Sequence, residues 1–171
     1  FIAGKGKVLL AVDYAQFELR LAAALAHDEE MIAIFNADRD VHTEMAAQIY
    51  QVDVKDVTKD QRRVAKTVNF SVLYGAGPRN LMQTVGNISF AEAKQIIDRW
   101  FEARHKIRNY LDSILKQAEE QGFVETYFGR RRPTPDIKSS NFQVREAAKR
   151  ASANMPIQGT EADLMKLAML K

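Results

Sequence analysis

The sequence predicts an α+β fold that is predominantly helical, with a helical subdomain inserted into a sheet-based one. Three observations support this prediction. An apolar, partly β-branched run at residues 8–14 (VLLAVDY) is typical of a buried strand. Helical periodicity with capping residues then continues to about residue 121. A short hairpin pattern and one long helical pattern close the chain.

Start and stop signals place the first helices. After the predicted strand the chain turns helical from Gln16 to about His27, and Asp28 is a typical N-cap for a short helix through Phe35. A further helix is predicted for residues 41–50. Thr58 then opens a long helix, which the residues Gly75, Gly77 and Pro78 end.

The second half of the chain continues this alternation. A short helix is predicted for residues 79–85, and Ser89 caps the next, with Glu92 at the capping-box distance. Helices reach about Gln121, after which residues 123–129 (FVETYFG) alternate like a strand of a small hairpin. A long helix follows from about residue 142, and we expect Pro156 and Gly159 to kink or interrupt it.

The composition is globular, with 46% hydrophobic and 27% charged residues in 171. The chain has no cysteine, which excludes disulfides and thiolate metal sites. No apolar run approaches the roughly 18 residues of a membrane span, so we expect no membrane partner. Because the chain opens just before a strand and closes in an unterminated helical pattern (ADLMKLAMLK), we expect a fragment of a longer protein.

The net charge is only +3, but the cations are unevenly distributed. Residues 58–79 hold five cations against one carboxylate, and residues 130–150 hold seven against two. Two basic blocks in a nearly balanced chain suggest anionic partners at two places. The alternative is that each block is a solvated helix face, which is the commoner explanation of any single charge run.

The long helix contains the most informative pattern, RRVAKTVNFSVLYG at residues 62–75. Its residues Arg62, Lys66, Phe70 and Tyr74 are four apart and form one stripe about 18 Å long. Two cations suit phosphate oxygens, and two aromatic rings one turn further suit a base or sugar. A nucleoside triphosphate would match that order, although spacing alone favours a solvated cationic end with two half-buried aromatics.

Two other groups could carry chemistry. Asp13 stands at the end of the predicted strand, where a carboxylate can hold a divalent cation, although Asp is also a common strand terminator. Glu18 follows at a helix start, where its charge also suits the helix dipole. In RASANMPIQG, the side chains of Arg150, Asn154 and Gln158 could bind acceptors in a nucleic-acid groove. The alternative is that Asn and Gln near the proline cap helix ends.

Taken together, these segments resemble the bacterial DNA polymerase I family (family A) over essentially the whole chain. VDYAQFELR (residues 12–20) resembles its motif A, and RRVAKTVNFSVLYG resembles its motif B on a helix of the fingers. The segments DVHTE, ETYFGRRR, REAAKRASANMPIQG and ADLMKLAM resemble further parts of that family in the same order. The resemblance implies a partial polymerase palm (residues 1–40 and 136–171) with an inserted helical fingers subdomain (residues 41–135).

The resemblance also implies roles for individual residues. Asp13 would be a catalytic, metal-binding aspartate, and the backbone carbonyl of Tyr14 a further ligand, in a site for two Mg²⁺ ions. Glu18 would exclude a ribose 2′-hydroxyl and be held by Tyr74. His42, otherwise unremarkable as a lone histidine near a helix start, would contact the incoming triphosphate.

The remaining roles concern the triphosphate and the DNA. Arg62 and Lys66 would hold the triphosphate, with Lys66 also the general acid for pyrophosphate, and Phe70 would pack on the incoming nucleotide. Tyr74 would mark the template insertion position. Four polar residues would lie along the minor groove near the primer terminus: Arg150, Asn154, Gln158 and, also near the nucleotide, Gln16.

The implied activity is template-directed DNA synthesis on primer-template DNA with deoxynucleoside triphosphates, in replication or repair. The parent would be a monomer in the cytoplasm of a bacterial or phage-infected cell, associated with the nucleoid. No His-Asp-Glu tripeptide of the family's motif C is found, so we expect this fragment to be inactive alone. A non-catalytic nucleic-acid or nucleotide binding module, or a relative of single-subunit RNA polymerases, remains an alternative.

Three positions depart from the family pattern. Ala15 stands where Ser is usual and Phe17 where Ile is usual, both beside the catalytic aspartate. Glu161 replaces a small residue and adds a negative charge close to the residues expected to contact DNA. The first two bear on nucleotide selectivity, and the sequence offers no account of the third.

Overall fold

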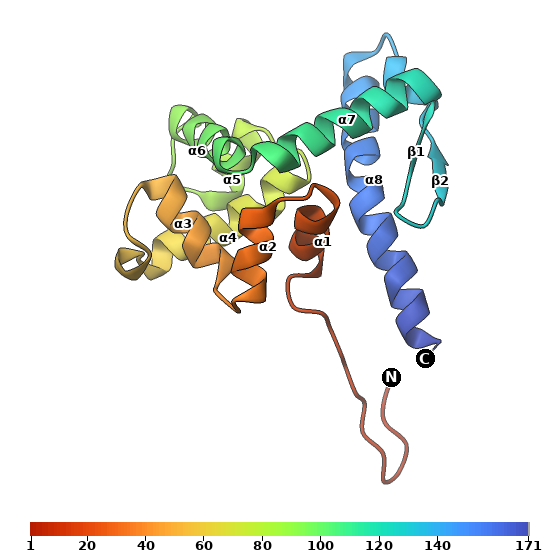
Figure 1. Ribbon diagram of the computed structural model, residues 1–171, viewed down its shortest axis with the longest axis horizontal. Helices are drawn as coiled ribbons and strands as arrows, with labels where there is room; N and C mark the ends of the chain where they lie inside the picture. Colours follow the sequence, from red (N-terminus) through yellow and green to blue (C-terminus); the bar gives the residue numbers. More distant parts are fainter. Residues whose placement is uncertain (171) are drawn as a thin grey trace.

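The protein is described by a computed structural model that covers residues 1–170, and helices dominate it (Figure 1). The prediction of a predominantly helical α+β fold is confirmed. The elements, in chain order, are α1 (Phe17–Leu25), α2 (Glu29–Asn36), α3 (Val41–Tyr50), the 3₁₀ turn η1 (Val54–Asp56), α4 (Lys59–Leu73), α5 (Pro78–Val85), α6 (Phe90–Ala103), α7 (His105–Gln121), β1 (Phe123–Glu125), β2 (Arg131–Pro133), η2 (Pro135–Lys138) and α8 (Phe142–Met169).

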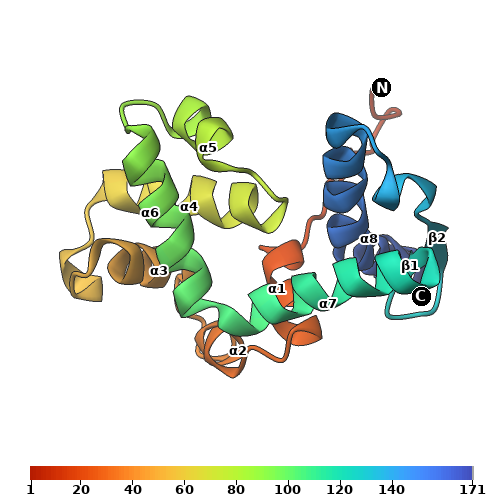
Figure 2. The same cartoon turned by 90° about the horizontal axis from the view of Figure 1, so that it is seen from above.

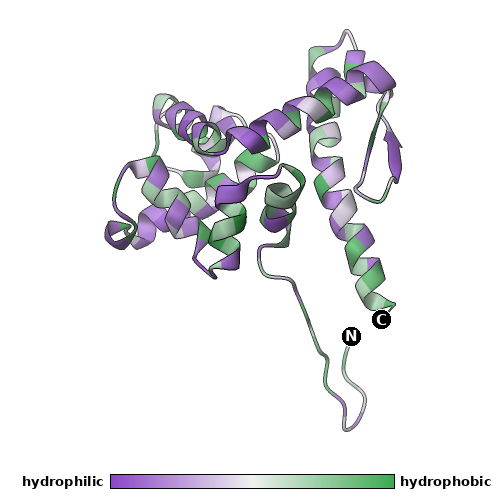
Figure 3. Ribbon diagram, in the orientation of Figure 1, coloured by the Kyte–Doolittle hydropathy of each residue, from purple (hydrophilic) through white to green (hydrophobic). Residues whose placement is uncertain are grey.

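The predicted N-terminal strand does not form. Residues 8–14 lie in an exposed tail that leaves the helices and is largely hydrophobic (Figure 3). Val8 and Leu10 are 86% and 84% exposed. A strand needs the hydrogen-bonding groups of a neighbouring strand, and no segment among residues 1–170 pairs with this one. The prediction of a buried strand is therefore wrong for the chain by itself.

The starts of α2, α4 and α6 follow from capping side chains, as predicted. The buried carboxylate of Asp28 accepts a hydrogen bond from the Met31 amide (3.0 Å) at the start of α2. Thr58 and Ser89 each form a reciprocal capping box with the residue three positions later. These caps satisfy amide groups that the first turn of a helix cannot pair internally.

The helices form two groups joined by α7. In the view from above, α3, α4, α5 and α6 lie together on one side, and α7 leads from them to α8 and the hairpin (Figure 2). The core between α3, α4 and α6 includes fully buried Trp100, Met45 and Ile49. Among the described residues, no helix combines the length and the apolar character needed to cross a membrane.

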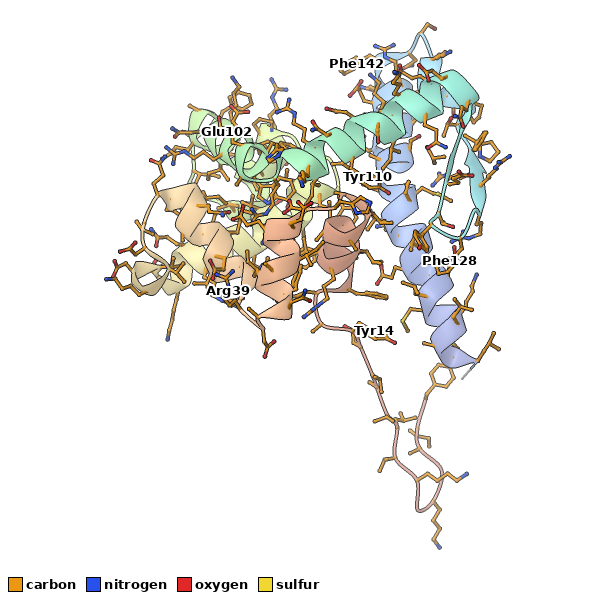
Figure 4. All side chains as sticks on the ribbon, viewed as in Figure 1. Tyr14, Arg39, Glu102, Tyr110, Phe128 and Phe142 are labelled. Atoms are coloured by element: carbon orange, nitrogen blue, oxygen red, sulfur yellow. The ribbon has the colours of Figure 1, made fainter. Side chains whose placement is uncertain are left out.

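Helix α8 runs unbroken from Phe142 to Met169, so the predicted interruption at Pro156 and Gly159 is wrong. Proline removes one helical hydrogen bond, and the buried neighbours Met155 and Ile157 keep this part of α8 in the core. The antiparallel hairpin β1–β2 places its turn against α8, where the Tyr127 amide donates to the Thr160 hydroxyl (2.9 Å). Phe128 lies at that turn (Figure 4).

Gly159 permits this contact, because a Cβ added there would lie 2.5 Å from the Cγ2 of Thr126. We therefore expect Gly159→Ala to lower the free energy of unfolding by about 1–3 kcal/mol, through forced separation of the hairpin from α8. Chemical denaturation measures this. The control is Gly4→Ala, where an added Cβ meets nothing within 4 Å. Equal stability of both variants would contradict the close contact.

Candidate nucleotide and nucleic-acid site

Helix α4 presents one polar and one buried face. Its exposed side carries Arg62 and Lys66. Phe70 lies one turn after Lys66 and Tyr74 two turns after it, and both are half-buried. The opposite side is buried in the core through Val64, Ala65, Val68 and Val72. The structure therefore brings the four predicted residues into a single stripe, with the cations in solvent and the aromatic rings at the edge of the core.

Arg62 is held by a carboxylate that sequence reasoning missed. Its guanidinium donates to both oxygens of Asp40, with Nε–Oδ2 at 2.5 Å and Nη2–Oδ1 at 3.2 Å. Asp40 also caps α3 and accepts from the Thr43 hydroxyl. Burial opposes ionisation of Asp40, but the hydrogen bonds from Arg62 and Thr43 prevail and lower its pKa to about 2. Lys66 makes no ion pair with any residue in the described range.

His42 lies on α3 against this stripe, with its ring centroid 6.0 Å from that of Phe70. Its side chain is buried, and its Nδ1 is 2.9 Å from the Nδ2 of Asn69 on α4. The Oδ1 of Asn69 in turn accepts from the indole N–H of Trp100 on α6 (2.8 Å). Burial lowers the pKa of His42, the Asp40 carboxylate opposes this, and the Arg62 and Lys66 cations add to it.

Three elements meet at the C-terminal end of α4. The Tyr74 hydroxyl is buried beside the carboxylate of Glu18 on α1 and the amide of Gln158 on α8, without a well-formed hydrogen bond to either. Burial first, and then the Glu18 carboxylate, raise the pKa of Tyr74 well above its ordinary value. The predicted neighbours Glu18 and Tyr74 are thus brought together, although they are far apart in sequence.

A pocket of about 410 Å³ opens beside Tyr74, between the end of α4, the start of α5 and α8. It is lined by Ser71, Tyr74, Gly75, Ala76, Gly77, Asn80 and Arg150. Gly75 has a positive φ of 77°, and a Cβ there would lie 3.1 Å from the Cγ of Arg150. The left-handed turn thus lets the chain reverse while Arg150 packs against it. The volume is in the range of sites for small molecules.

The other two predicted residues of α8 continue from Arg150 at four-residue steps. Asn154 is half-buried, with its Oδ1 unpartnered, and Gln158 is exposed. Part of the neighbouring basic block has a structural use, since Arg130 binds Asp163 (2.9 Å) and the Gly159 carbonyl (2.8 Å). Arg131 likewise pairs with Glu125 (3.2 Å). This block is therefore less available to an anionic partner than its charge count suggests.

The candidate metal ligands are less organised than the α4 stripe. Asp13 and Tyr14 lie in the exposed tail, and Tyr14 packs its ring 4.7 Å from that of Phe17 (Figure 4). Gln16, half-buried with a left-handed φ of 56°, precedes α1. A carboxylate and a carbonyl oxygen suit Mg²⁺ in kind. Within residues 1–170, however, no group of three or more potential ligands is assembled. The donors present thus fit Mg²⁺ but do not complete a site.

Glu161 lies on the same side of α8 as Gln158. Burial raises its pKa, and the carboxylates of Glu18 and Asp13 add to this effect. It therefore adds a third negative charge to the region where α1 meets α8, which its position in the sequence alone did not reveal.

Asn69 and Trp100 are the other residues that sequence reasoning missed. A signal for Asn69 existed, because it is a polar residue on the face of α4 that carries Ala65, Val68 and Val72. A buried amide on an apolar face requires partners, although nothing in the sequence spacing identifies Trp100 as one of them.

The chain matches the family model for DNA polymerase family A over residues 1–171. It is 47% identical over its full length to the thermostable DNA polymerase I of Thermus filiformis and to that of Thermus aquaticus, in each case covering 20% of the relative. DNA polymerase I of Pseudomonas aeruginosa is 45% identical over 170 residues, 99% of this chain and 18% of that protein.

A solved structure is similar as well. It is described as the POL domain of Pol1 from M. smegmatis in complex with DNA primer-template and dNTP, with a TM-score of 0.84 and 40% identity. The match covers 92% of this chain and 28% of that one. The chain belongs to DNA polymerase family A, and it spans about a fifth of the length of the curated relatives it matches.

The Asp40–Arg62 pair has a consequence for acid stability. The pKa of Asp40 is about 2 in the folded protein against an ordinary 3.8, so the ionised group stabilises the fold above about pH 4, and this contribution is lost as the pH falls toward 2. We expect Asp40→Asn to lower the free energy of unfolding at neutral pH by about 0.5–1 kcal/mol, because solvent screens a side chain that is a third exposed.

Denaturation at several pH values tests this, and the difference between the original chain and Asp40→Asn is expected to shrink between pH 4 and pH 2. Asp60→Asn is the control, since the Asp60 side chain is 90% exposed and 3.6 Å from Arg63. A difference that stays constant down to pH 2 would show that the pair does not depress the pKa of Asp40.

Proposed function

We propose that the chain is the nucleotide-binding part of a template-directed DNA polymerase, which transfers a nucleotidyl group from a deoxynucleoside triphosphate to a primer 3′-hydroxyl. The observation that carries this proposal is the α4 stripe, with two exposed cations followed by two half-buried rings. Its far end meets Glu18 and Gln158 from two other elements. The similar M. smegmatis structure, described as a complex with DNA primer-template and dNTP, supports the same assignment.

The proposed division of the chain is close to its two groups of helices, and the hairpin, which packs against α8, lies at the boundary. Residues 41–135 would form the fingers, and residues 1–40 and 136–171 would form parts of the palm. Helix α7 leads from the first group to the second, which supports a boundary close to the hairpin. The exposed hydrophobic tail would pair as a strand within the palm of the complete protein, together with residues that this chain does not supply.

The triphosphate would lie along the N-terminal half of the α4 stripe. Arg62 and Lys66 would hold phosphate oxygens by charge-assisted hydrogen bonds, and His42 would add a donor from α3. The primer 3′-hydroxyl would lose its proton to solvent as its oxygen attacks the α-phosphorus, the bond from that phosphorus to the α,β-bridging oxygen breaks, and pyrophosphate leaves. Lys66 would give its proton to the leaving pyrophosphate. Phe70 would pack against the sugar and base.

The other end of the stripe would read the sugar and the DNA. Glu18, which lies beside the buried Tyr74 hydroxyl, would occupy the space that a ribose 2′-hydroxyl needs. Tyr74 would stand at the template insertion position, next to the pocket that Arg150 lines. The half-buried amide of Asn154, with an unpartnered oxygen, would join Gln158, Arg150 and Gln16 in contacts to minor-groove acceptors and donors.

Asp13 and the Tyr14 carbonyl would hold Mg²⁺, which, when bound, neutralises charge on the reacting oxygens. Residues 1–170 assemble no group of three or more such ligands, and a second carboxylate would come from elsewhere in the parent. The 171 residues alone would therefore extend no primer. The parent would act as a monomer in replication or repair, in a bacterial or phage-infected cell.

A chimaera tests the enzyme assignment, in which these 171 residues replace the matching segment of the Thermus aquaticus polymerase. We expect primer extension by the chimaera. Asp13→Ala should lower its rate about a thousandfold, and Lys66→Ala about a hundredfold or more. Lys116→Ala on exposed α7 is the control and should change little. Binding of primer-template that survives both substitutions, without any incorporation, would instead favour a non-catalytic binding module.

Glu18 decides between DNA and RNA synthesis. In the same chimaera we expect deoxynucleotides to be strongly preferred, and Glu18→Ala to raise kcat/KM for ribonucleotides by about 10–100-fold, because a steric obstacle to the 2′-hydroxyl is removed. Single-nucleotide incorporation kinetics measure this. Efficient ribonucleotide use by the unmodified chimaera would favour the relationship to single-subunit RNA polymerases.

A further inference from the structure

Three buried side chains form a hydrogen-bonded chain that crosses the helices behind the candidate triphosphate site. The indole N–H of Trp100 on α6 donates to the Oδ1 of Asn69 on α4 (2.8 Å). The Nδ2 of Asn69 is 2.9 Å from the Nδ1 of His42 on α3. The three residues are 0%, 1% and 3% exposed, so water does not compete for these contacts.

The chemistry of these three side chains determines which atom donates and which accepts in each of their hydrogen bonds. An indole N–H can donate but cannot accept, so the atom of Asn69 that faces Trp100 must be its oxygen. The amide nitrogen then faces His42, and an amide NH₂ can only donate. The Nδ1 of His42 must therefore be the unprotonated, accepting nitrogen. The proton of a neutral His42 then resides on Nε2.

Other protonation states of His42 are disfavoured by the same contacts. A proton on Nδ1, in the cation or in the second neutral tautomer, would point at the NH₂ group of Asn69, whose nitrogen is only 2.9 Å from Nδ1. Rotating the Asn69 amide would relieve that clash but would turn its NH₂ toward the Trp100 N–H. One buried hydrogen bond is lost in either case. Burial, which lowers the pKa of His42, acts in the same direction.

We propose that Asn69 and Trp100 are positioning residues that hold His42 as the neutral Nε2–H tautomer, so that it donates one directed hydrogen bond to a phosphate oxygen. His42 is then a donor rather than a third cation beside Arg62 and Lys66. Its Nε2 makes no hydrogen bond to the described residues, which leaves this proton for a ligand. The Phe70 ring centroid lies 6.0 Å from that of the imidazole, with the two ring planes tilted by 49°. The proposal rests on the proposed binding of a triphosphate at α4.

The tautomer can be observed without any activity. The full chain holds three histidines, so ¹⁵N-histidine labelling and two-bond ¹H–¹⁵N correlation, with His42→Gln for assignment, identify the protonated nitrogen. We expect His42 to carry its proton on Nε2. The same labelling in the chimaera extends the measurement to the complete polymerase. A proton on Nδ1 in the unmodified protein would overturn the proposal.

Two substitutions change the hydrogen bonds among Trp100, Asn69 and His42 in different ways. Asn69→Asp is nearly isosteric and offers His42 an acceptor in place of a donor, so we expect the proton to move to Nδ1. Trp100→Phe removes the indole N–H and frees the amide to rotate, so both tautomers should be populated. Ile96→Val, buried on α6 without a polar contact, is the control and should leave Nε2–H unchanged. An unchanged tautomer in Asn69→Asp would also overturn the proposal.

Kinetics in the chimaera connect the tautomer to nucleotide binding. We expect Asn69→Asp to raise KM for a deoxynucleoside triphosphate about tenfold, the effect of one hydrogen bond to a charged group, with kcat nearly unchanged. Ile96→Val should alter neither. His42→Ala distinguishes the tautomer of His42 from its role in triphosphate binding. If the tautomers behave as expected but His42→Ala leaves KM unchanged, the NMR result stands and the role of His42 in triphosphate binding is refuted.

Discussion

The side-chain amide of Asn69 is buried where α3, α4 and α6 meet, and both of its ends are engaged. Removing it would strand the Trp100 N–H and the His42 Nδ1 in an apolar core, at a cost of about 1–3 kcal/mol for each unsatisfied group. The rotation of α4 about its axis is set by this contact and by the buried Val64, Val68 and Val72. With that rotation fixed, Arg62 and Lys66 face solvent, and Phe70 and Tyr74 lie at the edge of the core.

The two ends of α4 contact different elements. At the N-terminal end, the Thr58 capping box sets the first turn and Asp40 of α3 holds Arg62. At the C-terminal end, Tyr74 is enclosed by Glu18 of α1 and Gln158 of α8. A ligand along the stripe would therefore touch parts of the chain that are more than a hundred residues apart. Glu161 adds negative charge at the second end and is coupled to Glu18 and Asp13.

The sequence predicted what local chemistry determines. The caps at Asp28, Thr58 and Ser89, the end of α4 before Gly75, the end of α7 at Gln121 and the hairpin all formed as expected, because they depend on neighbouring residues. The α4 stripe was readable because helical geometry fixes which residues share a face.

What failed depends on distant partners. The apolar run at residues 8–14 has strand composition but no strand beside it, so its pattern could not show that it would remain exposed. Pro156 and Gly159 were expected to kink or interrupt α8, yet the helix is not interrupted, and buried neighbours hold this part of it in the core. Asp40, Asn69 and Trp100 support the site across 22 to 31 residues of sequence, and no spacing rule links them to Arg62 or His42.

Binding of a nucleoside triphosphate by α4 and His42 can be measured on the chain itself. Titration of the ¹⁵N-labelled chain with a deoxynucleoside triphosphate, followed by amide and side-chain chemical shifts, tests this most directly. We expect saturable changes in the signals of Arg62, Lys66 and Phe70 and at the Nε2 of His42. Changes confined to the basic hairpin around Arg130, with α4 and His42 unaffected, would contradict it.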